Sequence, residues 1–227
     1  MSTALVIPAA GTGRRLGLGK PKAIIDVAGI PMVRRTLSRF ERVNEIVCTV
    51  VVAPPGFLPD VRNALLGLRW EGCEVSVVAG GSTRQDSVRC GLAALGPKVD
   101  LVCVHDAARP LVTHTTISAV LDAARQSGAA VAASRPNDSV REDVEGGGTR
   151  PLDRSRLWLV ETPQAFKLDL LRNAHERARA VGYAATDDAT LVEWFGGATV
   201  TIVESDGWNP KITRPADLRI VRQMLDG

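Results

Sequence analysis

Short apolar runs alternate with amphipathic segments along most of the chain. Six of these runs are rich in valine and alanine and are nearly continuous rather than alternating with polar residues. That pattern is typical of parallel strands covered on both faces. The predicted strands are residues 4–8, 46–53, 74–78, 101–104, 129–133 and 198–203.

Between these runs, apolar residues recur at helical spacing, as in Val88, Leu92 and Leu95. The alternation of strands and helices predicts a single Rossmann-like α/β domain with a mostly parallel, twisted sheet. In such a sheet, ligands bind beyond the carboxyl ends of the strands. The predicted helices follow Pro31, begin near Asp86, surround Ile117 and Leu121, and cover residues 168–180 and 215–225.

Residues 135–156 interrupt this alternation, because they are rich in charged residues and poor in apolar ones. Within them, Gly146-Gly147-Gly148 indicates the tip of a hairpin. The pattern leaves two interpretations open: a surface loop, or an arm that leaves the domain and packs on a partner subunit. We therefore divide the chain into a core of residues 1–134 and 157–227 and an arm of residues 135–156.

Composition narrows the class of protein. The 227 residues are 45% apolar, enough for one well-buried core. A net charge of +3 is too mild to indicate nucleic-acid binding. The four cysteines lack metal-site spacing and are interpreted as reduced thiols, which suits a reducing compartment. We find no signal-peptide pattern and no run long enough to span a bilayer. We therefore expect a cytoplasmic protein with neither a membrane nor a nucleic-acid partner.

The first candidate site is the loop Pro8-Ala9-Ala10-Gly11-Thr12-Gly13-Arg14-Arg15, followed by Lys20-Pro21-Lys22. It begins where the first predicted strand ends. Glycines let backbone N–H groups approach a ligand, and the small alanines leave room for a flat base. The clustered cations require an anion of several charges, so the loop indicates a nucleoside triphosphate.

A dinucleotide cofactor is the alternative interpretation of this loop. Gly11, Gly13 and Gly17 form a near match to its fingerprint, but the last spacing is one residue too long. The second strand ends Val51-Val52-Ala53-Pro54, without the acidic residue that would bind the ribose. The cations fit better where phosphoryl charge develops during a reaction.

Two further segments follow predicted strands. Gly80-Gly81-Ser82-Thr83-Arg84-Gln85-Asp86-Ser87 opens a helix and provides a polar cradle; helix capping explains Asp86 or Ser87 but not the paired glycines. Asp106 follows the strand 101–104, and Mg²⁺ prefers carboxylates together with phosphate oxygens. Asp106 is therefore the candidate metal ligand, with a structural cap or an ion pair with Arg109 as the alternative.

In order along the chain, these segments resemble the family of 2-C-methyl-D-erythritol 4-phosphate cytidylyltransferases. The loop at Pro8 alone is shared with sugar nucleotidyltransferases. The more specific motifs are His105-Asp106-Ala107-Ala108-Arg109-Pro110, Asp153-Arg154, Thr162-Pro163-Gln164, Thr186-Asp187 and Lys211-x-Thr213-Arg214-Pro215.

The resemblance implies transfer of CMP from CTP to methylerythritol phosphate, with Mg²⁺ or another divalent cation. It also implies a homodimer in which the arm of residues 135–156 reaches the neighbouring subunit. It assigns catalysis to Arg15, Lys22 and Lys211; nucleotide binding to Pro8, Ala9, Ala10, Gly11, Gly13, Gly81, Ser82, Ser87 and Ala107; and acceptor binding to Asp106, Arg109, Ser139, Arg154, Thr186 and Lys211.

Two single residues and one short segment depart from the family pattern. Ser82 stands where some members carry aspartate, Ser139 replaces a threonine but keeps the hydroxyl, and Trp208-Asn209-Pro210 differs from the usual polar run. Three rival functions stay open: a cytidylyltransferase for another alditol phosphate such as ribitol 5-phosphate, an NAD(P)-dependent oxidoreductase, and a nucleotide-binding regulator without catalytic activity.

Overall fold

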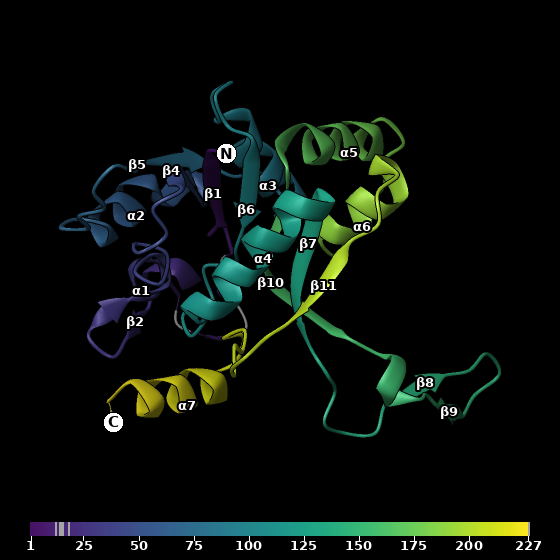
Figure 1. Ribbon diagram of the computed structural model, residues 1–227. Coiled ribbons are helices and arrows are strands. Elements are labelled where there is room, and N and C mark those ends of the chain that lie inside the picture. Colours follow the sequence, from purple (N-terminus) through teal and green to yellow (C-terminus); the bar gives the residue numbers. More distant parts are fainter. Residues whose placement is uncertain (12, 14–15, 18, 227) are drawn as a thin grey trace.

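A seven-stranded sheet forms the centre of the computed structural model, which describes residues 1–11, 13, 16–17 and 19–226 (Figure 1). Neighbouring strands run parallel except where β10 pairs antiparallel with β6 and β7. The predicted α/β domain with a mostly parallel sheet is confirmed. In sheet order the strands are β11 (Thr201–Glu204), β7 (Ala129–Ser134), β10 (Leu159–Lys167), β6 (Leu101–Val104), β1 (Thr3–Pro8), β4 (Ile46–Ala53) and β5 (Glu74–Ala79).

Strand β10 is the sheet element that the apolar pattern missed. Pro163 lies within it, and a proline argues against a central strand because it cannot donate to the ladder. The register of β10 against β7 shifts between Val160 and Gln164, so the proline falls at the irregularity. The Thr162–Pro163 peptide bond is cis.

Helices cover both faces of the sheet, in two apolar layers. On β1, Leu5 packs into one layer and Val6 into the other, which explains why the central strands are continuously apolar. All six apolar runs were expected to be covered on both faces, but the edge strands β5 and β11 are only partly covered. One face carries α1 (Met32–Leu37), α2 (Leu58–Ala64) and α4 (His114–Ser127); the other carries α3 (Arg84–Ala93), α5 (Leu168–Ala180) and α6 (Asp188–Leu191).

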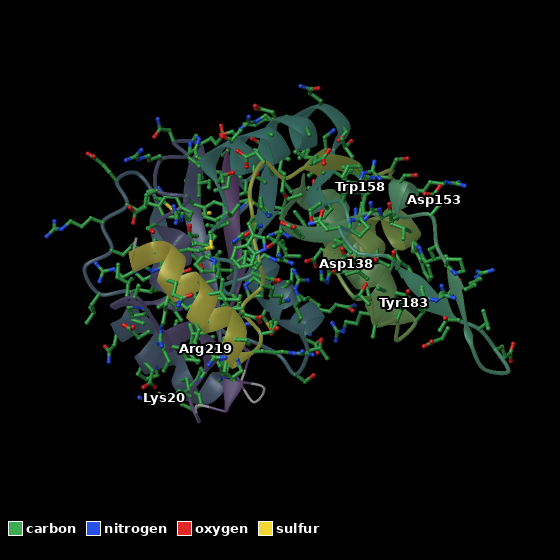
Figure 2. All side chains as sticks on the ribbon, turned by 90° about the horizontal axis from the view of Figure 1, so that it is seen from below. Lys20, Asp138, Asp153, Trp158, Tyr183 and Arg219 are labelled. Atoms are coloured by element: carbon green, nitrogen blue, oxygen red, sulfur yellow. The ribbon has the colours of Figure 1, made fainter. Side chains whose placement is uncertain are left out.

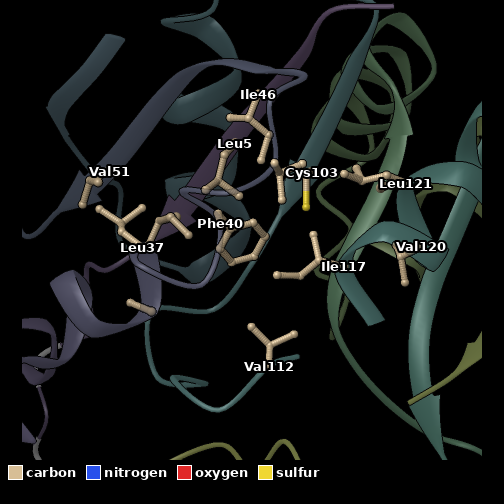
Figure 3. Packing of buried hydrophobic residues seen from close by; sticks show 14 of the residues in the cluster. Leu5, Leu37, Phe40, Ile46, Val51, Cys103, Val112, Ile117, Val120 and Leu121 are labelled. Atoms are coloured by element: carbon tan, nitrogen blue, oxygen red, sulfur yellow. The ribbon is translucent and has the colours of Figure 1, made fainter. Parts of the chain in front are cut away.

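The layer on the α1, α2 and α4 face is built around Phe40, which is fully buried among Leu5, Ile117 and Cys103 (Figure 3). Close packing here holds α1 and α4 against the sheet. Helices α2 and α6 were not predicted. Helix α2 buries only Val61, and α6 has four residues, so neither shows a helical stripe of apolar positions.

Smaller elements complete the core. Strands β2 (Asp26–Val27) and β3 (Ile30–Pro31) form a separate pair, and α7 (Pro215–Asp226) packs through Val221 onto a third apolar cluster. Single 3₁₀ turns lie at Lys22–Ile24, Pro55–Phe57 and Arg154–Arg156, and a π-helical turn lies at Val192–Gly196. Within the described ranges, the chain has no helix with both the length and the apolar character of a membrane span.

The arm leaves the sheet between β7 and β10. Its strands β8 (Arg141–Asp143) and β9 (Thr149–Pro151) pair as an exposed hairpin that lies well away from the sheet (Figure 1). The three glycines at 146–148 lie at its tip, as predicted, and all adopt positive φ. At the base, the Arg135 guanidinium stacks on the Trp158 ring with its carbon 3.4 Å from the ring centroid. Figure 2 shows Trp158 and Asp153 on this side of the molecule and Lys20 on the opposite side.

Candidate active site

The site lies where four parallel strands end at one edge of the sheet. Strands β1, β4, β5 and β6 all point their carboxyl ends toward this edge, and the order of connections reverses beside β1. Such a switch point leaves a crevice for ligands. A pocket of about 350 Å³ opens there. Its lining residues are Pro8, Ala9, Gly11, Gly13, Lys22, Ala23, Arg84, Asp106, Ala107, Ala108 and Lys211.

A second pocket of about 250 Å³ adjoins the first and shares Pro8, Gly11 and Arg84 with it. It adds Ala10, Gly81, Ser82, Thr83 and Ser87. The nucleotide-binding residues predicted from the sequence therefore divide between two adjoining pockets. We call the pocket with Lys22 and Asp106 the cationic pocket and the other the glycine pocket.

The paired glycines are required by close packing in the glycine pocket. A Cβ atom on Gly80 would lie 2.8 Å from both the Ala10 Cβ and the Ser87 Oγ. A Cβ on Gly81 would lie only 2.3 Å from the Asp86 Cβ. Real Cβ atoms do not approach other atoms so closely, so larger residues would push this loop away from Ala10 and from helix α3.

Hydrogen bonds at the start of α3 use the hydroxyls that the sequence singled out. Thr83 caps the helix by accepting from the Asp86 backbone N–H, so the helix begins at Arg84 rather than near Asp86. The Ser82 and Thr83 hydroxyls each donate to Asp86 at 2.9 Å and hold the pKa of that carboxyl below its usual value. The Ser87 hydroxyl donates to the Thr83 carbonyl at 2.8 Å. Ser82 and Ser87 therefore keep only oxygen lone pairs for a ligand.

The loop after β1 folds back so that Lys22 borders the cationic pocket. The Lys22 backbone N–H donates to the Gly11 carbonyl at 3.2 Å. Gly13 has a φ of +70°, and a Cβ there would lie 2.8 Å from the Lys20 carbonyl oxygen. Arg15, the other predicted partner of the phosphates, lies outside the described residues together with Arg14.

Asp106 is the carboxylate at the centre of the cationic pocket. Its Oδ1 lies 3.1 Å from the Arg84 Nε, and its Oδ2 lies 2.7 Å from the Lys211 Nζ. The Arg109 Nε is 3.9 Å from Oδ2. Burial alone would raise the pKa of Asp106, but Arg84, Lys211 and Arg109 together hold it well below its usual range. The carboxylate is therefore ionised among an excess of cations, which leaves the pocket suited to anions.

Buried contacts fix the backbone beneath Asp106. The Thr162 hydroxyl accepts from the Asp106 backbone N–H at 3.0 Å and donates to the His105 Nδ1 at 3.1 Å. The other ring nitrogen of His105 donates to the Arg109 carbonyl at 3.1 Å. Burial lowers the pKa of His105 to about 4, so its ring is neutral. Thr162, on the strand that the pattern missed, thus anchors the carboxyl end of β6.

Sequence reasoning missed a second set of residues behind the pocket. The Arg84 Nη1 lies 2.8 Å from the Asp188 Oδ2, and the Asp188 Oδ1 lies 3.1 Å from the His175 Nε2. Arg84 stood within a motif noted in the sequence and Asp188 directly follows another, but their pairing spans distant segments. His175 carried no signal, because a lone histidine on a helix is usually part of the core.

Three predicted acceptor residues lie apart from this centre. Ser139 and Arg154 belong to the arm, and Thr186 is exposed in the loop before α6. In the described part of the chain, none of the three lines either pocket. Arg109, by contrast, lines a neighbouring hollow of about 640 Å³ at the base of the arm, with Asp138 also on its wall.

The contacts of Asp106 do not fit the prediction that it is a metal ligand. Arg84 and Lys211 each engage one of its two oxygens. Across residues 1–11, 13, 16–17 and 19–226, no group of three or more histidine, cysteine or acidic side chains is placed to hold a metal ion. The side chains that contact Asp106 are thus cations, which suits the pocket to anions.

A glycine pocket beside a cation-lined pocket, at the switch point of a mostly parallel sheet, suits a nucleotide whose phosphates react, as in the class of nucleotidyltransferases. Comparison with known proteins narrows the class. Residues 3–226 match the model of the IspD family, 2-C-methyl-D-erythritol 4-phosphate cytidylyltransferase, and the chain belongs to this family.

Individual relatives agree with this family. The chain is 38% identical to the 2-C-methyl-D-erythritol 4-phosphate cytidylyltransferase of Bacillus licheniformis, over 100% of this chain and 96% of the relative. It is 42% identical to the protein of that name from Pelotomaculum thermopropionicum, over 98% and 93%. The crystal structure of 4-diphosphocytidyl-2C-methyl-D-erythritol synthase from Anaerococcus prevotii superposes with a TM-score of 0.89 at 27% identity, covering 100% of this chain and 96% of that one.

Proposed function

We infer that the protein is a CTP-dependent cytidylyltransferase that makes 4-diphosphocytidyl-2-C-methyl-D-erythritol and pyrophosphate from CTP and 2-C-methyl-D-erythritol 4-phosphate. Family membership over residues 3–226 supports the reaction. The observation that supports the site most strongly is a pocket lined by Lys22 in which Arg84 and Lys211 each contact one oxygen of Asp106.

The chemistry is an in-line displacement at the α-phosphorus of CTP. An oxygen of the acceptor phosphate forms a bond to this phosphorus, and the bond from the phosphorus to the bridging oxygen breaks. The electron pair leaves with pyrophosphate. The acceptor phosphate is already anionic near neutral pH, so the reaction needs neither a covalent enzyme intermediate nor a general base of unusual pKa. The protein's task is to hold two mutually repelling anions in line.

The two pockets divide this task. The glycine pocket accepts the cytosine and ribose against Ala10, Gly81 and Ser87, and the cationic pocket accepts the triphosphate beside Lys22. Lys22, with Arg15, stabilises the charge that develops on the transferred and leaving phosphates. Mg²⁺, when present, would be held mainly by phosphate oxygens of the nucleotide and would neutralise part of their charge.

The acceptor binds on the Asp106 side of the cationic pocket. Lys211 and Arg109 attract its phosphate, while Asp106 accepts hydrogen bonds from its hydroxyl groups. Thr186 is the outermost member of this proposed acceptor site. These roles follow from the resemblance and are supported by the contacts that Arg109 and Lys211 make with Asp106.

Ser139 and Arg154 reach the acceptor in this scheme only from a second copy of the chain. The arm of residues 135–156 extends from the core of residues 1–134 and 157–227, and its hairpin is exposed. The hollow at its base is walled by Leu159 and Trp208, each 51% exposed. Such apolar exposure favours burial against another protein surface. We therefore propose a homodimer in which each arm completes the partner's acceptor site.

The four cysteines are all free, and this fits the cytoplasmic location that we propose.

Pyrophosphate release tests the function directly. Each of the four nucleoside triphosphates is supplied with Mg²⁺, alone or with methylerythritol phosphate or ribitol 5-phosphate. The proposal predicts release from CTP only when methylerythritol phosphate is present, together with the diphosphocytidyl product. Release with ribitol 5-phosphate instead would move the function to another alditol phosphate, and CTP binding without release would indicate a regulator.

A further inference from the structure

A line of polar contacts begins behind the cationic pocket and ends at Asp106. It starts at His175 on α5, which lies 3.1 Å from the first oxygen of Asp188. The second oxygen of Asp188, at the start of α6, lies 2.8 Å from Arg84 at the start of α3. Arg84 then reaches Asp106 through its Nε at 3.1 Å. Three helices of one face are thus tied to the carboxylate in the pocket.

The members farthest from the pocket are the most completely buried. The Arg84 side chain is 26% exposed and that of Asp106 is 9% exposed, whereas His175 and Asp188 are 2% and 1% exposed. An ionised carboxylate at such depth is costly unless hydrogen bonds satisfy its oxygens. The position of Asp188 therefore depends on its donors.

The two oxygens of Asp188 are divided between two donors. A carboxylate only accepts, so His175 must carry a proton on Nε2 and donate it to Oδ1. Arg84 donates to Oδ2. The other ring nitrogen of His175 is buried without a hydrogen-bond partner in the described part of the protein, so Asp188 supplies the polar contact that orients the ring.

Because His175 satisfies one oxygen of Asp188, Arg84 needs to satisfy only the other and can also contact Asp106. Without the His175 donor, Oδ1 of Asp188 would be buried and unsatisfied. The planar guanidinium of Arg84 can satisfy both oxygens of one carboxylate with two parallel donors. Turning to do so would withdraw its Nε from Asp106. Because Arg84 borders both the cationic and the glycine pocket, this movement would disturb the space between the two substrates.

We propose that His175 is a positioning residue for the transfer reaction: by occupying one oxygen of Asp188, it keeps Arg84 on Asp106 and between the two pockets. The inference rests on the proposed function, because its effect is measured through that reaction. A displacement of about 1 Å at such a group costs roughly 10²-fold in rate.

The test compares two substitutions at one position. His175→Leu fills the buried volume but removes the donor, whereas His175→Gln places an amide nitrogen where the Nε2 lay. We expect kcat/KM for the acceptor to fall by about 10- to 100-fold in His175→Leu and to recover most of that loss in His175→Gln. His175→Asn, whose amide is too short to reach Asp188, replaces the leucine variant if that variant does not fold. His114→Leu, at an exposed histidine on the opposite face, is the matched control and should leave kcat/KM unchanged.

A double-mutant cycle separates positioning from a merely structural role. In an Arg84→Ala background, assayed with more enzyme, His175→Leu should cause no further loss of kcat/KM, because the residue through which His175 acts is absent. An equal fold-loss in both backgrounds, wild-type kinetics in both His175→Leu and His175→Asn, or no recovery in His175→Gln would overturn the proposal. Failure of the wild-type protein to transfer CMP would instead refute the proposed function, so the wild-type assay is done before any variant is tested.

Discussion

The Lys211 ammonium nitrogen lies 2.7 Å from the Asp106 Oδ2, although the two residues follow different strands of the sheet. Lys211 comes from the segment after β11, and Asp106 follows β6. Asp106 thus supplies a negative charge beside cations that would otherwise be unpaired before an anionic substrate arrives. In the proposed reaction, an incoming acceptor phosphate competes with this carboxylate for Lys211. We therefore propose that the contact marks the acceptor side of the cationic pocket.

Lys22 provides the first prediction. Lys22→Ala removes a positioned donor for the developing phosphate charge, and such losses typically cost about 3–4 kcal/mol, or roughly 10²–10³ in rate. We expect kcat to fall by that order while the fold, followed by circular dichroism, persists. Lys98→Ala, at an exposed lysine distant from both pockets, serves as the control. An unchanged kcat in Lys22→Ala would remove this lysine from the mechanism.

Arg154 tests the acceptor site. Arg154→Lys keeps the positive charge but loses the fork of parallel donors that suits a phosphate. The KM for methylerythritol phosphate should rise far more than the KM for CTP. Steady-state kinetics with each substrate varied in turn distinguishes the two constants. An equal rise in both would contradict the assignment of Arg154 to the acceptor.

Subunit sharing makes a separate prediction. Inactive Lys22→Ala and Arg154→Ala chains are mixed and allowed to exchange. If each arm serves the partner, one site of the heterodimer combines an intact Lys22 with an intact Arg154, and activity returns. Absence of activity after verified exchange would show that each chain uses its own arm.

His105 predicts a pH dependence of stability. Burial lowers its pKa in the folded protein to about 4, from 6.5 in the unfolded chain. Between these values the unfolded state binds more protons, so the free energy of unfolding falls as pH drops through the window, by about 3 kcal/mol in all. The carboxylates Asp106 and Asp188 also have lowered pKa values, but their contributions are lost only as pH falls toward and below the usual 3.8.

Urea unfolding between about pH 7 and about pH 5 measures this slope. His105→Gln lacks the titrating ring, so its free energy of unfolding should change less with pH across the same range, whatever its absolute stability. A slope identical to that of the wild-type protein would show that His105 is not the group responsible.

Much of the fold was predictable, because the central strands are buried on both faces and show this as uninterrupted valine and alanine. Leu5 and Val6, in adjacent positions on β1, enter opposite apolar layers. Strand β10 escaped prediction because Pro163 interrupts it, and only the register shift beside that proline lets it lie within the sheet. Short helices such as α6 gave no period to detect.

The candidate site was predictable where it depends on strand ends. Lys22 and Asp106 follow β1 and β6, and parallel strands bring such loops to one edge. The pairing of Arg84 with Asp188 was not predictable, because it joins helices far apart in sequence and depends on how α3 and α6 pack. In the proposed dimer, Arg154 acts in the acceptor site of the partner subunit. Neither the spacing of residues in the sequence nor the geometry of one chain tests that role.

The most direct test of the central claim is a crystal structure of the protein with CTP and Mg²⁺. We expect cytosine in the glycine pocket beside Gly81 and Ser87, with the triphosphate in the cationic pocket against Lys22. A nucleotide bound elsewhere, or a Lys22 side chain turned to bulk solvent while CTP occupies the site, would contradict it.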